Sequence, residues 1–305
     1  MTGDDYRALR EGFGAHRLAR DVLSVGGPDA AAYLQGQCSQ DLDGLAVGAA
    51  VDSLLLEPDG KLTALVRVTR VADDRFVVDV DGGFGDAVAS RLARFKLRSK
   101  LAIEPLDWPA VALRGPRVAD VPPVAGGELL VLPFAWNGVA GSDLLGPGAE
   151  AVAADLEEVR WCDDEAWEAV RIEAGIPTMG RELDGKTIAA EAGLVERTVS
   201  FTKGCYTGQE LVARLDARGN RVARRLCGIV LDAPATDSGG LVGAELTATG
   251  KVVGAVTSAA WCPGVGAVAG LAYVHRSVDV GATVDVGPTS GEPVRGRVVT
   301  LPMTG

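Results

Sequence analysis

The last third of the chain carries a pattern that restricts it to a small all-β unit. After Arg225, short valine-rich segments alternate with Gly, Pro and Asp. Their spacing, roughly 8–12 residues, is typical of strands in a barrel or a sandwich. The segments are 226–231, 251–258, 265–274, 282–286 and 294–301. We therefore expect a domain boundary near Arg225 and a small C-terminal antiparallel β-barrel over residues 226–305.

Residues 1–225 mix the signals of helices and strands, which predicts an α+β body. Apolar and polar residues alternate over 51–80, with turn sequences at 58–60 and 72–74, so we expect three consecutive strands there. The helix predicted at 163–175 is the clearest, because an aspartate can cap its start, Gly175 and Pro177 stop it, and Trp167 lies on its apolar face. Further helices are predicted at 28–34, 84–97 and 149–156, and further strands at 101–103, 110–113 and 129–132.

The chain is acidic on average and basic in two places. It carries 41 Asp and Glu against 30 Lys and Arg, a formal net charge of −11, which argues against a general binder of nucleic acids or anionic membranes. Six cations and two acids occupy 203–225, whereas 91–100 contains no acid. Each cluster is either part of a site for an anionic ligand or an ordinary solvated helix face. In the second cluster the helix pattern predicts a solvent-facing row of Arg91, Arg94 and Arg98.

The cysteines and histidines argue against common metal sites. Cysteine occurs five times without a CxxC pair, which argues against a disulfide framework or a structural zinc site and favours a reducing compartment. Histidine occurs only at His16 and His275, so we predict no bound metal. The first residues are acidic and lack an apolar signal region, and no run of about 18 apolar residues occurs. We therefore expect a cytoplasmic protein that does not enter a membrane.

The segment 200–225, SFTKGCYTGQELVARLDARGNRVARR, places a cysteine in front of a predicted helix. Thr207 and Glu210 match a T-x-x-E capping box, which predicts a helix from there to about Arg218. Cys205 then precedes the helix N-terminus and lies two residues from Lys203, and both the helix dipole and an ammonium group favour the thiolate. Cys205 is therefore a candidate reactive thiol. The alternative is a small residue that packs under a loop.

The same segment carries a family resemblance. FTKGCYTGQELVAR resembles the signature of the YgfZ family, whose core is K-G-C-Y-x-G-Q-E. Further matches are YLQGQ at 33–37, a P-x-G hairpin within 56–67, WEAVRIEAGIP at 167–177, EAGL at 191–194 and barrel strands at 250–258 and 271–274. The resemblance covers most of the chain. This family is in turn similar to the aminomethyltransferase, or T-protein, of the glycine cleavage system.

The resemblance implies a fold and a function. It implies an aminomethyltransferase-like folate-binding body over 1–225, built from two intertwined subdomains, followed by the barrel over 226–305. It also implies binding of tetrahydrofolate or a one-carbon-substituted form, and a role in the assembly or repair of iron–sulfur clusters. Through those clusters the protein would support radical enzymes that modify tRNA. Its partners would be folate and iron–sulfur proteins or their assembly factors, with no strong direct binding of nucleic acid.

The resemblance further implies site residues. Trp167 matches a tryptophan that is linked to folate, and its ring can stack on a pterin, although it can also serve as a core anchor of its helix. Glu191 lines up with an acid that holds the pterin's amino edge in T-proteins, and a carboxylate can accept two N–H bonds from such an edge. The folate carboxylates would face one of Arg218, Arg224 and Arg225. The reactive site around the thiol would consist of the motif residues Lys203, Cys205, Tyr206, Gln209 and Glu210.

Two departures from the family pattern bear on activity. The N-terminal folate tryptophan of the family falls near Arg20, and the Asp-Asp pair of T-proteins is replaced by Thr63 and Ala64. Without a carboxylate there, aminomethyl transfer lacks its acid/base group. We therefore expect an accessory folate-binding factor rather than a glycine cleavage enzyme. Two alternatives stay open: a folate-dependent one-carbon transferase or demethylase, and an interaction protein that has lost the ligand.

Overall fold

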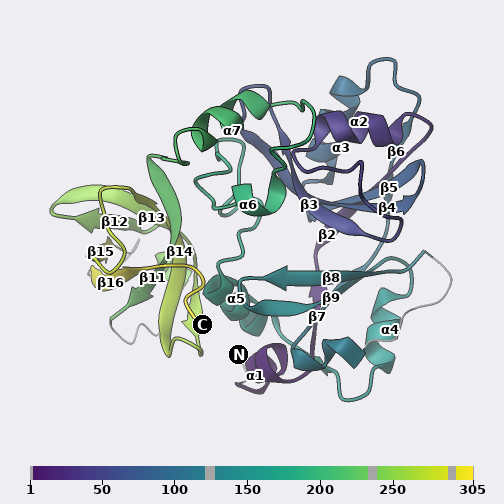
Figure 1. Ribbon diagram of the computed structural model, residues 1–305. Coiled ribbons are helices and arrows are strands. Elements are labelled where there is room, and N and C mark those ends of the chain that lie inside the picture. The colour runs from purple at the N-terminus through teal and green to yellow at the C-terminus, as the bar shows by residue number, and fades with distance from the viewer. Residues whose placement is uncertain (1–2, 121–127, 233–238, 288–292, 305) are drawn as a thin grey trace.

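The chain folds around two five-stranded sheets and a closed barrel (Figure 1). The computed structural model describes residues 3–120, 128–232, 239–287 and 293–304. Its α-helices are α1 (Gly3–Glu11), α2 (Ala30–Gln37), α3 (Gly85–Lys96), α4 (Ala149–Asp155), α5 (Asp164–Ala174), α6 (Val195–Thr198) and α7 (Gln209–Asp216), and its 3-10 turns are η1 (Pro116–Asp120) and η2 (Gly239–Leu241). An α+β body followed by a C-terminal barrel, as expected from the sequence, is confirmed.

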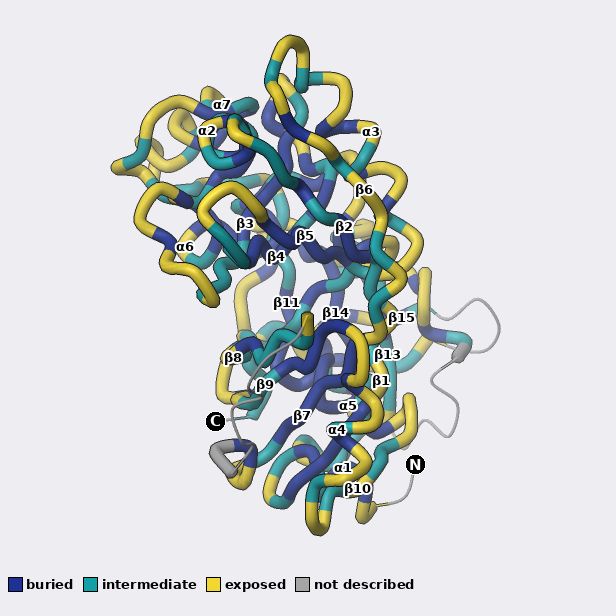
Figure 2. The backbone as a smooth tube through the Cα atoms, turned by 90° about the vertical axis from the view of Figure 1, so that its right-hand side faces the viewer, coloured by how far each residue is buried: buried dark blue, intermediate teal, exposed yellow. Residues whose placement is uncertain are grey.

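The first sheet has the strand order β3-β4-β5-β2-β6. Its strands are β2 (Arg20–Gly26), β3 (Ala50–Leu56), β4 (Leu62–Ala72), β5 (Arg75–Asp81) and β6 (Ala102–Leu106). The predicted meander over 51–80 is confirmed, because β3, β4 and β5 pair antiparallel in sequence order. Helices α2 and α3 pack on this sheet, and Leu34, Val88 and Leu92 fill the core between them. Figure 2 shows the central strand β5 as largely buried.

The second sheet has the order β10-β1-β7-β9-β8. Its strands are β1 (Gly14–Leu18), β7 (Ala110–Arg114), β8 (Leu130–Trp136), β9 (Val139–Leu145) and β10 (Arg160–Trp161). The chain starts this sheet with β1, builds the first sheet, and returns with β7. The two sheets meet through one apolar cluster, in which Val22 and Val77 of the first sheet join Ala110, Leu132 and Leu145 of the second.

The C-terminal strands close a barrel in the order β11-β14-β13-β12-β15-β16. They are β11 (Arg224–Leu231), β12 (Glu245–Ala248), β13 (Lys251–Cys262), β14 (Ala267–His275), β15 (Thr283–Gly287) and β16 (Val294–Val299). All five predicted segments are strands. The missed strand, β12, has the sequence ELTA and only Leu246 buried, so it lacks the valine pattern by which the others were recognised. The barrel begins at Arg224, while the boundary near Arg225 and the division into domains stay predictions.

Helix α5 connects the second sheet to the barrel (Figure 1). Asp163 caps it, with its side chain accepting a hydrogen bond from the Ala166 amide at 2.7 Å. Gly175 ends it in the left-handed conformation, with φ of 69°, a backbone geometry that glycine adopts without steric cost. Both predicted ends of this helix are therefore confirmed. Its buried residues Ala169, Val170 and Ile172 share one core with Leu271 of β14.

Three predictions for the basic segments are wrong. Helix α7 begins after Gly208, whose φ is 83°, with no side-chain cap, so Thr207 and Glu210 form no capping box. The helix ends at Asp216 rather than about Arg218. Arg91 does not face solvent: it is 3% exposed and donates from Nε and Nη2 to the Leu56 carbonyl. The long arginine side chain reaches back across the sheet to an acceptor that helix periodicity cannot reveal.

The core beneath α2 gives a direct test of the packing. Leu34 is fully buried, so Leu34→Ala should lower the free energy of unfolding by about 2–5 kcal/mol, through lost burial and the cavity left behind. Leu97→Ala is the matched control, because Leu97 is 89% exposed and the change should stay within about 0.5 kcal/mol. Urea denaturation of the two variants measures both effects. Equal losses would contradict this assignment of the core.

Candidate functional site

A cavity of about 910 Å³ lies where the two sheets, α5 and the barrel strand β13 meet. Its size falls within the range of roughly 300–1,000 Å³ typical of small-molecule sites. Trp136, Trp167, Trp261 and Phe134 supply aromatic surface. Charged side chains of both signs also line it: Arg17, Arg20, Asp52, Arg67, Asp81, Arg114, Asp143, Asp164, Glu165, Glu168, Arg171 and Arg181.

An ionic cluster at the cavity wall joins the two sheets. Arg67 on β4 donates from Nε to Asp79 on β5 at 3.0 Å and from Nη1 to Asp143 on β9 at 2.6 Å. Arg20 also pairs with Asp79, and Arg114 with Asp143. Burial alone would raise the pKa of Asp79 and Asp143, but the guanidinium groups outweigh it and hold both pKa values below their usual range. Both acids are therefore charged at neutral pH, and Arg67 ties one sheet to the other.

Trp167 lies between a histidine and an arginine in the same cavity. Its ring stacks on the His16 ring with 4.8 Å between centroids and 7° between planes. The guanidinium carbon of Arg114 is 5.3 Å from the Trp167 ring and 3.7 Å from the Phe134 ring, distances at which a cation is attracted to an aromatic face. The partner of Trp167 seen here is thus a protein ring, and a ligand would share the tryptophan with His16.

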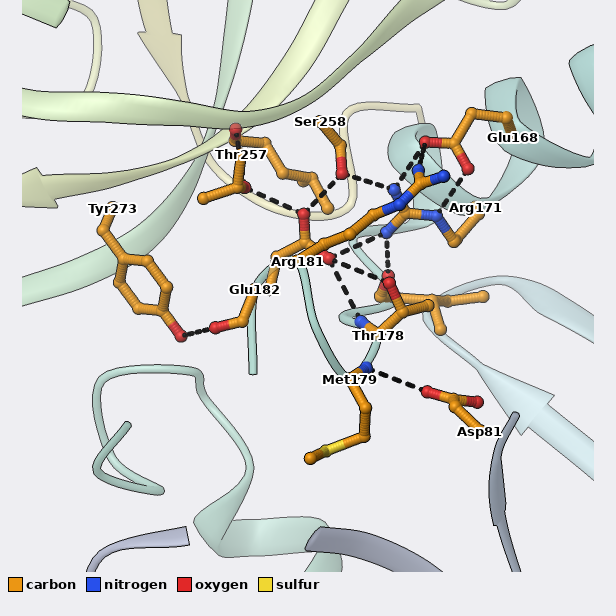
Figure 3. A network of polar contacts seen from close by, with 12 residues as sticks. Asp81, Glu168, Arg171, Thr178, Met179, Arg181, Glu182, Thr257, Ser258 and Tyr273 are labelled. Carbon is orange, nitrogen blue, oxygen red and sulfur yellow. Dashed lines mark hydrogen bonds and ion pairs between the residues drawn. The ribbon is translucent and has the colours of Figure 1, made fainter. Parts of the chain in front are cut away.

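Arg171 fixes the part of the cavity wall that is formed by α5, the segment 176–182 and the barrel (Figure 3). It lies on α5 and donates to both carboxylate oxygens of Glu168 at 2.6 and 2.9 Å. It also donates to the Ile176 carbonyl at 2.7 Å, to Glu182 at 3.1 Å and to Ser258 of the barrel at 2.6 Å. All its donor directions are used although its side chain is only 3% exposed. One buried cation therefore connects α5, the segment 176–182 and the barrel.

Glu182 completes the same network. Its Oε1 accepts from Ser258 at 2.6 Å and from Thr257 at 2.8 Å, both on β13. Its Oε2 accepts from the Thr178 amide at 3.1 Å, and Tyr273 donates to its main-chain carbonyl at 2.9 Å (Figure 3). Both oxygens of this buried carboxylate therefore have hydrogen-bond donors, as a buried polar group requires. The segment 176–182 is thus fixed against the barrel along its length.

The motif residues form a loop that is not part of the cavity lining. Lys203 points its ammonium at the carbonyls of Gln35, Cys38 and Gln40, at 2.7, 2.7 and 2.8 Å. These three bonds use all its N–H groups, so it binds the C-terminal end of α2 rather than a thiolate. Burial lowers the pKa of Lys203 and raises that of Tyr206 to about 12. Cys205 between them is exposed, which excludes the alternative of a residue packed under a loop.

The cavity contains only part of the predicted site. Of the predicted folate contacts, Trp167 is among the described lining residues, whereas Glu191, Arg218, Arg224 and Arg225 are not. Glu191 is 7% exposed and pairs with Arg224 at 3.0 Å. Arg225 donates to the Val278 carbonyl. The helix α7 residues Gln209, Glu210 and Arg214 are likewise absent from the lining of this cavity.

The ionic cluster at the cavity wall was not predicted from the sequence. Arg67, Asp79, Arg114 and Asp143 are each at most 8% exposed and lie within strands that are mostly apolar. A charged residue at an inward-facing position of an alternating strand could have indicated a buried ion pair, because a buried charge requires a partner. It does not reveal which strand supplies that partner.

The described residues contain neither a group that could hold a metal ion nor a helix that could cross a membrane. Within 3–120, 128–232, 239–287 and 293–304, no group of three His, Cys, Asp or Glu is placed to hold a metal ion. None of the helices in the part of the chain that the structure describes is long and apolar enough to cross a membrane.

The chain is similar to known proteins both in its C-terminal barrel and over its full length. A family model described as the glycine cleavage T-protein C-terminal barrel domain matches residues 224–304, which contain β11–β16. The structure of the glycine cleavage system aminomethyltransferase T from Bartonella henselae superposes with a TM-score of 0.83. That superposition covers 99% of this chain and 89% of the other, at 22% identity, and so shows a shared fold.

Two relatives carry the similarity at the level of sequence. The mitochondrial iron-sulfur cluster assembly factor IBA57 of Mus musculus is 30% identical over 268 residues, covering 77% of this chain and 71% of that protein. The tRNA-modifying protein YgfZ of Edwardsiella ictaluri is 31% identical over 216 residues, covering 65% of each. The family resemblance inferred from the motif is confirmed by these matches.

Removing the buried guanidinium of Arg171 should destabilise the protein. Arg171→Met leaves Glu182 and Glu168 without their buried partner and should lower the free energy of unfolding by about 3–5 kcal/mol. The control is Arg181→Met, which removes an ion pair to the same Glu168 from a side chain that is 53% exposed, at a cost of about 0–1 kcal/mol. Denaturant titration distinguishes the two. Small losses of unfolding free energy of similar size in both variants would show that Arg171 does not fix this part of the cavity wall.

The five cysteines should differ sharply in reactivity. Cys205 is exposed, whereas burial raises the pKa of Cys38 to about 11 and of Cys162 to about 12, and also raises the pKa of Cys227 and Cys262. Iodoacetamide at about pH 8 should therefore alkylate one thiol per native chain, since the thiolate is the reacting form. Mass spectrometry should find that thiol at Cys205 and none labelled fast in Cys205→Ser. Fast labelling elsewhere would contradict the exposure pattern.

Proposed function

Since the chain belongs to the YgfZ-type family, which is related to the glycine cleavage T-protein, we propose that it binds a reduced folate in the central cavity and supports the assembly or repair of iron–sulfur clusters. The folate would be tetrahydrofolate or a one-carbon-substituted form. The observation that carries the proposal is the position of Trp167. The residue that the family resemblance links to folate lines the large aromatic cavity.

The cavity residues fit such a ligand. A folate combines a flat pterin, an aminobenzoyl ring and a glutamate with two carboxylates. Trp167, Trp136 and Phe134 offer aromatic surface for the two rings. Arg17 and Arg181 line the cavity with half-exposed side chains and can each bind a carboxylate through a forked pair of N–H groups. These arginines take the place of Arg218, Arg224 and Arg225 as candidates for the glutamate.

Glu191 has a different place in this proposal. It is paired with Arg224 outside the cavity lining, so a pterin in the cavity would be held by other residues. Glu191 and Arg224 would contact a folate only if it were bound beyond this lining. Their expected role therefore depends on where the ligand lies.

Cys205 would serve the iron–sulfur role from the protein surface. Its loop is attached to α2 by Lys203 and to the carbonyl of Gly36 by the Thr207 amide, so the exposed thiol sits on a fixed support. A fixed, accessible thiol can meet a cluster or a thiol of a partner protein, whereas the folate stays in the cavity. Lys203 and Tyr206 would then position the loop.

A one-carbon transferase or demethylase is the second candidate and has less support. Ala64 is fully buried, and Thr63 donates to Glu57 at 2.9 Å, so neither position supplies the carboxylate that T-proteins have there. The residues that line the cavity supply aromatic surface and charged groups for binding a ligand. We therefore favour an accessory folate-binding factor.

Removing the cavity tryptophan should weaken folate binding. Trp167→Ala should raise the Kd for tetrahydrofolate by about tenfold or more, because it removes a stacking surface. Trp108→Ala is the control, since Trp108 packs against the apolar cluster between the two sheets and is not among the described lining residues of the cavity. Calorimetric titration measures both, with circular dichroism to check the fold. Equal Kd values for wild type and Trp167→Ala would refute folate binding in this cavity.

The iron–sulfur role is tested separately through the thiol. Cys205→Ser should fold normally and bind tetrahydrofolate as the wild type does, yet fail to restore iron–sulfur enzyme activity in a strain that lacks the protein. Cys227→Ser, at a buried barrel position, is the control and should restore it. Full restoration by Cys205→Ser would remove the thiol from the function.

A further inference from the structure

His16 is a cavity residue to which the proposed function gives no role. It lies on β1, paired with Ala112 of β7, and the same strand pairs in parallel with β10. The ring is 7% exposed and lines the cavity beside Trp167. The chain has only one other histidine, His275, which is exposed and bonds to Ser277.

The surroundings of His16 fix which nitrogen carries the proton. Nδ1 lies 3.2 Å from the main-chain carbonyl of Cys162, which can only accept. The Nδ1 atom must therefore be the donor, and in the neutral ring Nε2 carries the free lone pair. The carbonyl itself is held in place, because the Cys162 amide donates to Ala15 at 2.8 Å.

Nε2 of His16 has no hydrogen-bond partner within the described part of the chain. Oδ1 of Asp164 lies 3.9 Å from Nε2, which is beyond hydrogen-bond distance, and it is itself an acceptor. Nε2 of His16 can therefore accept a hydrogen bond from a ligand in the cavity, next to the aromatic surface of Trp167.

The neutral form of His16 is favoured at physiological pH. Burial lowers its pKa, and the Arg114 guanidinium on β7 lowers it further, while the Cys162 carbonyl and the carboxylates of Asp163 and Asp164 at the start of α5 act in the opposite direction. The N-terminus of α5 itself adds positive potential at this point. The net direction is down, so Nε2 is an acceptor at neutral pH and becomes a donor when the pH falls through the pKa.

We propose that Nε2 of His16 accepts a hydrogen bond from the N5–H or N8–H of the cavity ligand and thereby selects a reduced tetrahydropterin over a fully oxidised pterin. The inference rests on the proposed function and names the form of folate that the site takes. In tetrahydrofolate the reduced ring carries hydrogens on N5 and N8. In folic acid the same two nitrogens have only lone pairs, which would face the lone pair of Nε2 and repel it.

The test is calorimetric titration of wild type and His16→Phe with tetrahydrofolate, under anaerobic conditions, and with folic acid. Phenylalanine keeps a flat ring against Trp167 and removes the acceptor. We expect His16→Phe to bind tetrahydrofolate about tenfold more weakly, the loss typical of one buried hydrogen bond, and to bind folic acid more tightly than wild type does, because the repulsion between lone pairs is gone. His275→Phe, the matched control, should change neither.

The pH dependence gives a second readout that a packing role would not produce. From about pH 8 to about pH 5, the preference of wild type for tetrahydrofolate should decline as His16 gains a proton. In His16→Phe, and in His16→Gln if the phenylalanine variant does not fold, this decline should be absent, because neither residue titrates. The ligand's own titration is common to all variants and cancels in the comparison.

Three outcomes are distinguishable. Equal weakening of both ligands by His16→Phe, or no weakening of either, overturns the role of His16 while leaving folate binding intact. Absence of tetrahydrofolate binding by wild type overturns the proposed function itself. Selective loss of tetrahydrofolate affinity together with loss of the pH dependence supports the assignment.

Discussion

The buried guanidinium of Arg171 is the constraint on which the cavity depends. Leaving the N–H groups of a cation that is 3% exposed without acceptors is costly, and the acceptors of Arg171 come from α5, from the segment 176–182 and from the barrel. Satisfying this one residue therefore holds three parts of the chain at fixed distances. Arg67 does the same between the two sheets. Arg67 and Arg171 both line the cavity, and the elements that they hold together form its walls.

The fold was largely predictable because it is encoded in local patterns. Alternation over 51–80 predicted β3–β5, and valine-rich segments predicted five of the barrel strands. The cap at Asp163 and the stop at Gly175 defined α5. The failures have a common cause, which is that a non-local partner overrides a local signal. Arg91 turns inward because the Leu56 carbonyl lies within its reach, and Gly208 starts α7 where the sequence offered a capping box at Thr207.

The candidate site was less predictable, because it is assembled from distant strands. The motif correctly identified a loop with an exposed thiol at Cys205. It did not show that Lys203 binds three carbonyls of the α2 end or that this loop lies outside the cavity lining. Trp167 was identified by resemblance alone. His16 gave no signal in the sequence, and the ionic cluster of Arg67 gave none beyond charges in mostly apolar strands, since their partners are contributed by other elements. The protein thus presents two separate features, an aromatic cavity between the sheets and the barrel and a surface thiol.

The most direct test of the account is a crystal structure of the chain with tetrahydrofolate bound. The account predicts electron density for the ligand inside the cavity, with its aromatic rings against Trp167 and a ring nitrogen within hydrogen-bond distance of Nε2 of His16. It also predicts that Glu191 remains paired with Arg224. Ligand density at Glu191 and Arg224, with the cavity beside Trp167 filled only by water, would contradict it.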